Sequence, residues 1–192
     1  MQSIEEFFGL KFNKMNKTSE KFRNNVMACI GGDPISRIIE NAILLENNPE
    51  PERKGGYLAI YDCPTERLIC TPFGEITEIK KARYCRNATE KVTRLIENGE
   101  SRSFSSRNEV KQHWGGGVRY NAMIIAFSGF VELIDEAVSL VYAVYKASEM
   151  YSKEKPSSFE FKSEIIRDTS SIAEKNYKDN PFIFPLVLAT FK

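Results

Sequence analysis

The feature that most constrains the fold is a short apolar segment, MIIAFS, at residues 123–128. Its apolar side chains follow one another without alternation, which predicts a strand that is buried on both faces. Three consecutive glycines, Gly115-Gly116-Gly117, break the chain before it, and Gly129 ends it. We therefore expect this strand to lie at the centre of a sheet.

Two hairpins are predicted to build that sheet. Residues 57–61 and 68–70 form two apolar runs rich in β-formers, and the segment 62–67 between them contains Asp and Pro, which favour a turn. Residues 118–120 can pair with residues 123–128 through a turn at Asn121. Hairpins rather than β-α-β units thus supply the strand pairs, and they favour an antiparallel sheet with packed helices, the α+β class.

Apolar residues at spacings of three and four predict the helices. Asp33-Pro34 starts the first one, which ends near Asn47, because Asp is a good N-cap and Pro suits the first helical position. The longest runs from Thr77 to the stop signal Asn98-Gly99. Two further helices are expected, one after Gly129 with acidic residues in its first turn and one around residues 165–173.

Charge excludes a polyanionic partner. Lys and Arg total 27 against 26 Asp and Glu, and the composition is that of an ordinary globular protein, with 42% hydrophobic residues. The helix at 77–98 carries a mildly basic strip, which we interpret as a solvated surface rather than a nucleic-acid interface. The strip consists of Lys80, Lys81, Arg83, Arg86, Lys91 and Arg94.

The chain is expected to contain one α+β core domain at residues 33–150, flanked by an N-terminal extension at residues 1–32 and a C-terminal part at residues 151–192. That last part should hold a helix and an apolar tail, PFIFPLVLATF, which docks on the core or on a neighbouring subunit. A homo-oligomer is therefore expected. The lack of a signal-peptide pattern and of an apolar run of about 20 residues predicts a cytoplasmic protein without a membrane partner.

The cysteines and the single histidine limit the chemistry. Cys29, Cys63, Cys70 and Cys85 include no C-x-x-C pair, so a structural zinc site is disfavoured and we interpret them as small buried hydrophobes. No catalytic residues can be assigned, because no nucleophile and base form a recognisable local signature, and whether the protein is an enzyme stays open.

Several short motifs stand in a characteristic order over about residues 35–147. The hairpin segments Leu58–Asp62 and Leu68-Ile69 come first. They are followed by Ala88-x-x-Lys91-Val92, the triple glycine at 115–117, the segment Ile124–Gly129 and the acidic pair Asp135-Glu136. In this order the motifs resemble those of the haem-degrading-domain family, the GlcG-like and HbpS-like proteins, which have a first hairpin, A-x-x-K-A, a Gly-Gly turn, I-G-V-S-G and an acidic pair. The resemblance implies a profilin-like or PAS-like α+β fold that binds a small molecule, with haem as one candidate cofactor.

Candidate ligand-binding residues cluster in two segments. His113 and Trp114 stand beside the triple glycine, which permits close approach of a ligand to the backbone. The predicted set consists of His113, Trp114, Gly115, Gly116, Gly117, Tyr120, Ser128, Gly129 and Asp135. His113 is the only imidazole available to ligate haem iron, and Tyr120 or Cys63 would otherwise have to serve.

Two classes of function remain open from the sequence. One is a small-molecule binding domain for haem or another planar or anionic ligand. The other is a non-catalytic assembly or regulatory module that uses the apolar tail and the Phe-rich start of the chain to contact other proteins.

Overall fold

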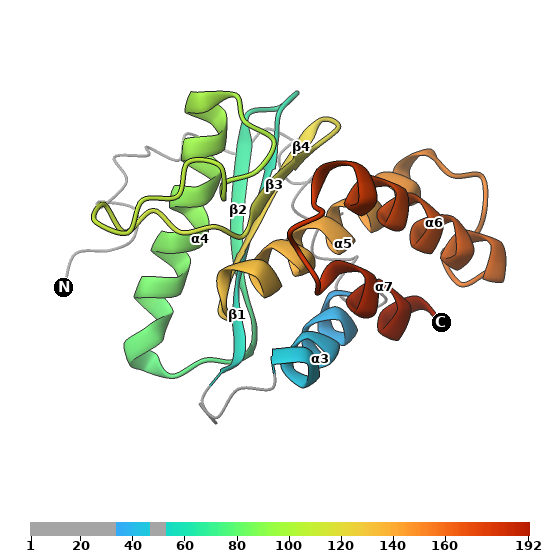
Figure 1. Cartoon of the computed structure of the whole chain (residues 1–192), viewed down its shortest axis with the longest axis horizontal. Coiled ribbons are helices and arrows are strands. Elements are labelled where there is room, and N and C mark those ends of the chain that lie inside the picture. Colours follow the sequence, from blue (N-terminus) through green and yellow to red (C-terminus); the bar gives the residue numbers. More distant parts are fainter. Residues whose placement is uncertain (1–33, 47–52) are drawn as a thin grey trace, which may run out of the picture. The chain divides into compact units, whose positions relative to one another are not determined.

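The computed structural model describes residues 34–46 and 53–192, and Figure 1 shows their arrangement. Four strands form one antiparallel sheet in the order β2-β1-β4-β3. Their bounds are β1 Lys54–Asp62, β2 Arg67–Glu75, β3 Gly117–Tyr120 and β4 Met123–Ser128. The predicted α+β class with an antiparallel sheet is confirmed.

Both hairpins form where the sequence predicts them. Strands β1 and β2 pair along their full length, and Pro72 is tolerated within β2 because β2 is an edge strand of the sheet. Strands β3 and β4 are joined by a two-residue turn, in which Asn121 adopts a left-handed conformation with φ 51°. Asn tolerates this conformation better than most residues, which explains its place in the turn.

Strand β4 lies inside the sheet, between β1 and β3, and each of its six residues is buried. The prediction of a central strand from its continuous apolar run is confirmed. Alternate side chains of β4 enter two separate cores: Ile125 and Phe127 belong to the larger one, and Ile124 and Ala126 to the smaller one.

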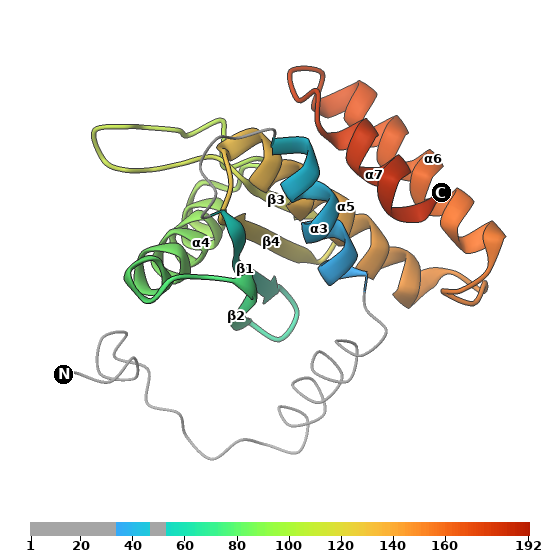
Figure 2. The same ribbon diagram turned by 90° about the horizontal axis from the view of Figure 1, so that it is seen from below.

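One long helix covers each face of the sheet (Figure 2). Helix α4, Glu78–Asn98, contacts β1 and β4 on the side of the smaller core, and Gly99 ends it in a left-handed conformation. Helix α5, Glu132–Tyr151, contacts β3 and β4 on the side of the larger core.

Three further helices pack on the α5 side. They are α3 Ile35–Glu46, α6 Phe159–Asn176 and α7 Ile183–Phe191. Helix α7 is the predicted apolar tail, and its side chains Ile183, Leu186 and Val187 are fully buried against this chain's own core. Residues 34–192 accordingly form one unit, in which 151–192 extend the core rather than forming a separate attachment.

The prediction for residues 1–32 lies outside the described residues, as does Asp33, the expected N-cap of α3. Among the helices that the structure describes, none is both long and apolar enough to cross a bilayer.

Candidate ligand-binding site

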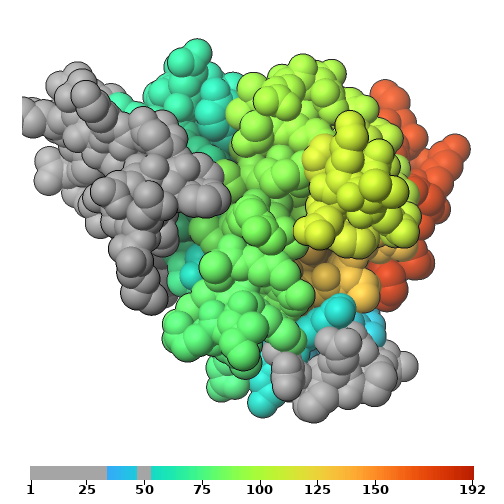
Figure 3. Space-filling model, turned by 90° about the vertical axis from the view of Figure 1, so that its left-hand side faces the viewer, coloured from blue at the N-terminus to red at the C-terminus, as the bar shows by residue number. Residues whose placement is uncertain are grey.

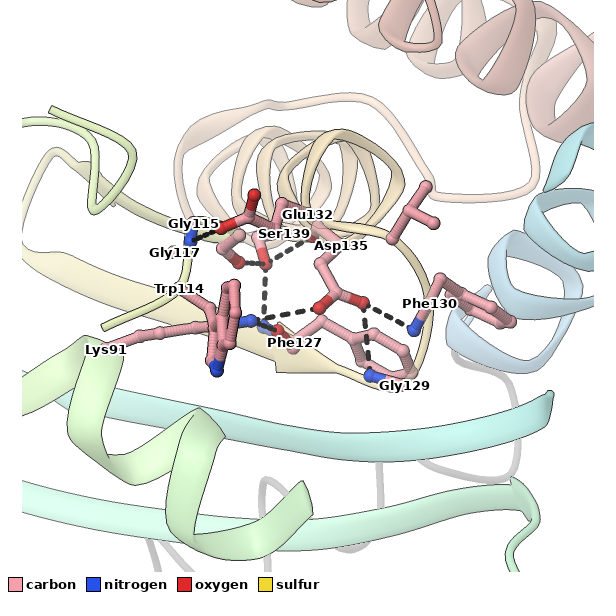
Figure 4. Close-up of polar contacts among 12 residues, drawn as sticks. Lys91, Trp114, Gly115, Gly117, Phe127, Gly129, Phe130, Glu132, Asp135 and Ser139 are labelled. Carbon is pink, nitrogen blue, oxygen red and sulfur yellow. Dashed lines mark hydrogen bonds and ion pairs between the residues drawn. The ribbon is translucent and has the colours of Figure 1, made fainter. Parts of the chain in front are cut away.

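A buried ion pair connects the two long helices at the end of β4 (Figure 4). The Lys91 ammonium of α4 lies 2.9 Å from the Asp135 carboxylate of α5, and the two side chains are 1% and 4% exposed. Lys91 Nζ also donates a hydrogen bond of 2.6 Å to the Phe127 carbonyl oxygen. Since isolated buried charges are very costly, each of these groups depends on the other.

The second oxygen of Asp135 fixes the turn between β4 and α5. It accepts hydrogen bonds from the backbone N–H groups of Gly129, at 3.1 Å, and Phe130, at 2.9 Å. Burial raises the pKa of Asp135 to about 6, while the Lys91 charge and these backbone donors oppose the rise. The Asp135 carboxylate therefore connects α4, α5 and the end of the central strand β4.

The middle glycine of the triple-glycine segment is required for this packing. Gly116 has φ 106°, and a Cβ atom there would lie 2.5 Å from Asp135 Cβ and 2.7 Å from Lys91 Nζ. The Ser139 hydroxyl holds the same segment, because it donates to the Gly116 carbonyl at 2.7 Å and accepts from the Phe127 N–H at 2.8 Å. Any larger residue at position 116 would push the ion pair apart.

A cavity of about 680 Å³ opens next to the ion pair. Figure 3 shows this face of the molecule, where the green surface of α4 and the yellow-green surface of the segment after it border the orange start of α5. The lining residues are Arg53, Arg83, Tyr84, Asn87, Lys91, Glu109, Gln112, Trp114, Ser128, Gly129, Phe130, Val131, Glu132 and Asp135. Both members of the ion pair thus belong to the wall of a cavity large enough for a small molecule.

The carboxylates on the cavity wall already have donors. Glu132 accepts a hydrogen bond of 2.6 Å from the Gly115 N–H, and its other oxygen lies 2.7 Å from Arg107 Nε. Arg107 also pairs with Glu109 at 2.7 Å. Asp135 is satisfied as described above, so each acidic side chain of the wall already pairs with a donor of this chain.

Two cationic side chains of the wall, Lys91 and Arg83, retain donors. An ammonium carries three N–H groups, and Lys91 uses two of them for partners within the described residues. The exposed Arg83 guanidinium lies over the Tyr84 ring, 5.4 Å from its centroid, and no carboxylate of the described residues pairs with it. The cavity is therefore better equipped to bind acceptors than donors.

Arg94 is another buried cation, and it supports the cavity wall without lining the cavity. Arg94 donates to the Ser103 and Trp114 carbonyl oxygens, each at 2.6 Å, and pairs with Glu90 at 2.7 Å. These contacts hold the segment that carries Trp114 against α4. The interpretation of the basic strip as solvated is wrong for Lys91 and Arg94, which are 1% and 5% exposed, because both find acceptors on neighbouring segments.

The structure brings together part of the predicted site. Trp114, Ser128, Gly129 and Asp135 line the cavity. The glycines lie beside them: Gly115 binds Glu132, Gly116 contacts the ion pair, and the Gly117 N–H donates to the Ser103 hydroxyl at 2.8 Å.

Two predicted residues lie apart from the cavity. Neither His113 nor Tyr120 is in its lining. His113 Nε2 lies 3.8 Å from a Glu90 carboxylate oxygen, and the His113 side chain is 33% exposed. Tyr120 packs against the larger core on the other side of the sheet.

Sequence reasoning missed Lys91 as a site residue, although a signal was present. Lys91 lies three residues after Ala88 and directly before Val92, and both neighbours belong to the buried smaller core. A lysine at such a position must bury its stem and find a counter-charge or an acceptor. Its partner, Asp135, is 44 residues away, so the local sequence cannot reveal the pair.

No metal centre is evident in the described part of the chain, where no group of three or more His, Cys, Asp or Glu residues could hold an ion. Comparisons with protein-family models, with curated proteins and with solved structures found no match to this chain.

Proposed function

We propose that this protein is a small-molecule binding domain of the GlcG-like and HbpS-like type, and that its ligand is a small anion that carries a planar or apolar group. The observation that supports this proposal most is the cavity of about 680 Å³ whose wall contains the buried Lys91–Asp135 pair. A buried ion pair at the wall of a cavity is a frequent feature of ligand sites and is costly to keep for stability alone.

The convergence of distant motifs supports the family part of the proposal. Lys91 and Asp135, which belong to two of the motifs that carry the resemblance, are 44 residues apart in the sequence. In the fold, Lys91, Gly116 and Asp135 meet at one point, and Ser128-Gly129 border the same cavity. A chance resemblance would not be expected to place these particular residues together.

The charge of the ligand follows from the donors of the wall. Lys91 and Arg83 keep N–H groups without a partner among the described residues, whereas Glu132, Glu109 and Asp135 are held by donors of this chain. A carboxylate or a phosphate would accept hydrogen bonds from both cations. A cationic ligand would have to share carboxylates that already pair with donors of this chain.

Aromatic residues of the wall suit a planar or apolar group. Tyr84 and Trp114 both line the cavity, and the Arg107 guanidinium lies 6.0 Å from the centroid of the Trp114 ring. This stacking and the Arg94 bond to the Trp114 carbonyl restrict the position of the indole. A pre-positioned ring lowers the entropic cost of binding a flat partner.

Haem is less suited to this cavity than a smaller anion. Nine of the fourteen lining residues are polar or charged, and His113, the predicted iron ligand, is not among them. The haem prediction has a direct test: titration with haemin should give a saturable Soret shift that weakens in His113→Ala if this histidine ligates the iron. We expect no such difference between wild type and variant.

The proposed ligand class can be tested with a panel of small carboxylates and phosphates, with and without an aromatic group, in a thermal-shift assay. Compounds that raise Tm should then be titrated by calorimetry. Arg83→Ala should weaken binding about tenfold or more, because it removes a charge-assisted hydrogen bond. The matched control is Arg86→Ala, an exposed arginine of the same helix that does not line the cavity.

Equal loss of affinity in both arginine variants would contradict a site in this cavity. The absence of any binder in the panel would favour the alternative function, a non-catalytic assembly module. That alternative now rests on less apolar surface, since α7 buries Ile183, Leu186 and Val187 within its own chain and leaves Phe184 52% exposed. The prediction of a homo-oligomer stays part of our proposal and is checked by sedimentation of the full-length protein.

A further inference from the structure

A pair of thiols lies between the sheet and α4. Cys70 belongs to β2 and Cys85 to α4, and the two Sγ atoms are 3.5 Å apart, with the Cys85 thiol donating to Cys70. The expectation that these cysteines are merely buried hydrophobes is incomplete, because both are only partly buried. The two thiols therefore face each other, and both are partly exposed to solvent.

The separation of the sulfur atoms is well suited to a disulfide. A disulfide bond is about 2.05 Å long, so the two sulfur atoms need to approach by only about 1.5 Å. Cys85 lies within α4, where its carbonyl oxygen also accepts a hydrogen bond of 2.8 Å from the Thr89 hydroxyl. The position of the Cys85 backbone is therefore well defined. Small rotations of two side chains can close the remaining distance without separation of β2 and α4.

The environment favours ionisation of one thiol. When Cys85 is ionised, the Cys70 thiol turns to donate to it, and this bond lowers the pKa of Cys85 to about 7, with Thr89 contributing and burial opposing. The same pairing and burial raise the pKa of Cys70. The other titratable groups nearby are Tyr57, whose pKa is raised, and Lys81 and Glu78, which pair with each other at the start of α4.

We propose that Cys70 and Cys85 form a redox site that a hydroperoxide oxidises reversibly to a disulfide linking β2 to α4. Neither cysteine lines the cavity, so the redox site is independent of the proposed ligand site. The two thiols are placed differently: Cys85 lies on α4 and donates to Cys70 Sγ, whereas Cys70 lies on β2 and donates to the Cys85 carbonyl oxygen at 3.9 Å.

The reaction is a two-electron oxidation in two steps. The Cys85 thiolate attacks the peroxide oxygen, so that an S–O bond forms, the O–O bond breaks, and Cys85 sulfenic acid results; the alkoxide or hydroxide that leaves takes up the proton that Cys85 released to solvent and becomes an alcohol or water. The Cys70 sulfur then attacks Cys85 Sγ; the S–S bond forms, the S–O bond breaks, and hydroxide leaves with the Cys70 proton as water. The peroxide is reduced, and the two thiols are oxidised to one disulfide.

The test uses the full-length protein, which contains four cysteines, treated with one equivalent of hydrogen peroxide and then alkylated under denaturing conditions. Peptide mapping should find the Cys70 and Cys85 peptides linked, with a mass lower by two hydrogens than the sum of the free peptides. Dithiothreitol should restore both thiols, and the oxidised protein should melt at a higher temperature because the link closes a loop.

Cys85→Ser and Cys63→Ser are the informative variants. Cys63 is also partly buried but lies beside Arg119 rather than beside another thiol, so Cys63→Ser should oxidise like the wild type. Under the same hydrogen peroxide treatment, Cys85→Ser should lose its remaining free thiols about tenfold more slowly than the wild type does.

Irreversible oxidation of single cysteines without a linked peptide in the wild type would overturn the proposal, as would linkage of Cys70 mainly to another cysteine. The mapping of the wild-type protein decides the question even if a variant does not fold.

Discussion

The two faces of the sheet are built differently. On the α5 face, the side chains of β4 enter a large apolar core to which α3, α5, α6 and α7 all contribute. On the α4 face, the fully buried core contains six of the described residues, three of which are alanines, Ala59, Ala88 and Ala126. The α4 face also holds the buried cations Lys91 and Arg94 and the thiols Cys70 and Cys85.

We infer that the α5 face mainly stabilises the fold and that the α4 face provides the candidate site. Apolar burial supplies most of the folding free energy, and the larger core accounts for most of that burial. Small residues on the other face leave space for long polar side chains and for a cavity. Apolar burial on the α5 face can thus offset the free energy that the buried polar groups cost on the α4 face, as is common at functional sites.

The largest effect is expected from Ile125→Asp, which places a charge in the larger core at a fully buried position of β4. The variant should not fold, because the carboxylate has no partner there. Circular dichroism and thermal melts would show this. The control is Leu68→Asp at a 40% exposed position of β2, which should melt close to the wild type. A soluble Ile125→Asp protein with a cooperative melt would contradict the assignment of this face.

On the other face, Lys91→Met tests the buried ion pair. The variant leaves Asp135 without its counter-charge, and we expect a loss of about 3–5 kcal/mol in the free energy of unfolding, measured with urea. Lys81→Met, a matched change at a 43% exposed side chain of the same helix, should leave the free energy of unfolding close to that of the wild type. Similar costs for both variants would mean that Lys91 is as solvated as its neighbours on the strip.

Gly116→Ala tests the point at which the triple-glycine segment, α4 and α5 meet. The added Cβ combines an unfavourable backbone conformation with clashes against Asp135 and Lys91, so a cost of about 3 kcal/mol is expected in urea unfolding. Gly99→Ala is the control, since Gly99 also has a positive φ but a Cβ there would meet no atom within 4 Å. That change should cost about 1 kcal/mol. Equal costs would show that backbone conformation alone requires Gly116.

The pH dependence of stability gives a smaller effect. The pKa of Asp135 is raised in the folded protein from 3.8 to about 6. Its contribution to stability is therefore fully present below about pH 4 and is lost as the pH rises through about 6, by at most about 3 kcal/mol. Between these pH values, the free energy of unfolding measured with urea should fall more steeply with pH in the wild type than in Asp135→Asn. Parallel curves would exclude Asp135 as the titrating group.

Much of the fold follows from local patterns in the sequence. The continuous apolar run predicts the central strand, Asn121 predicts the tight turn, and Asn98-Gly99 predicts the end of α4. Each of these signals acts through neighbouring residues, because backbone conformation and side-chain alternation are local properties. They are therefore visible without knowledge of the tertiary structure.

The site is only partly predictable because its key contacts are long-range. Asp135 can be named from its place in a motif, but an acidic residue in a first helical turn also has a local explanation. The sequence pattern assigns Lys91 to the surface, because its counter-charge and its carbonyl acceptor come from other elements. His113 stands out as the only histidine, yet its nearest carboxylate belongs to α4 and not to the cavity.

The most direct test of the central claim, that Lys91 is a buried ammonium presenting a donor to a ligand, is nitrogen-15 NMR of the lysine ammonium groups. We predict one ammonium signal that is protected from exchange with water, belongs to Lys91 and shifts when the tightest anion of the panel is added. Rapid exchange of all lysine ammonium groups, or a protected signal that does not respond to a bound anion, would contradict the account.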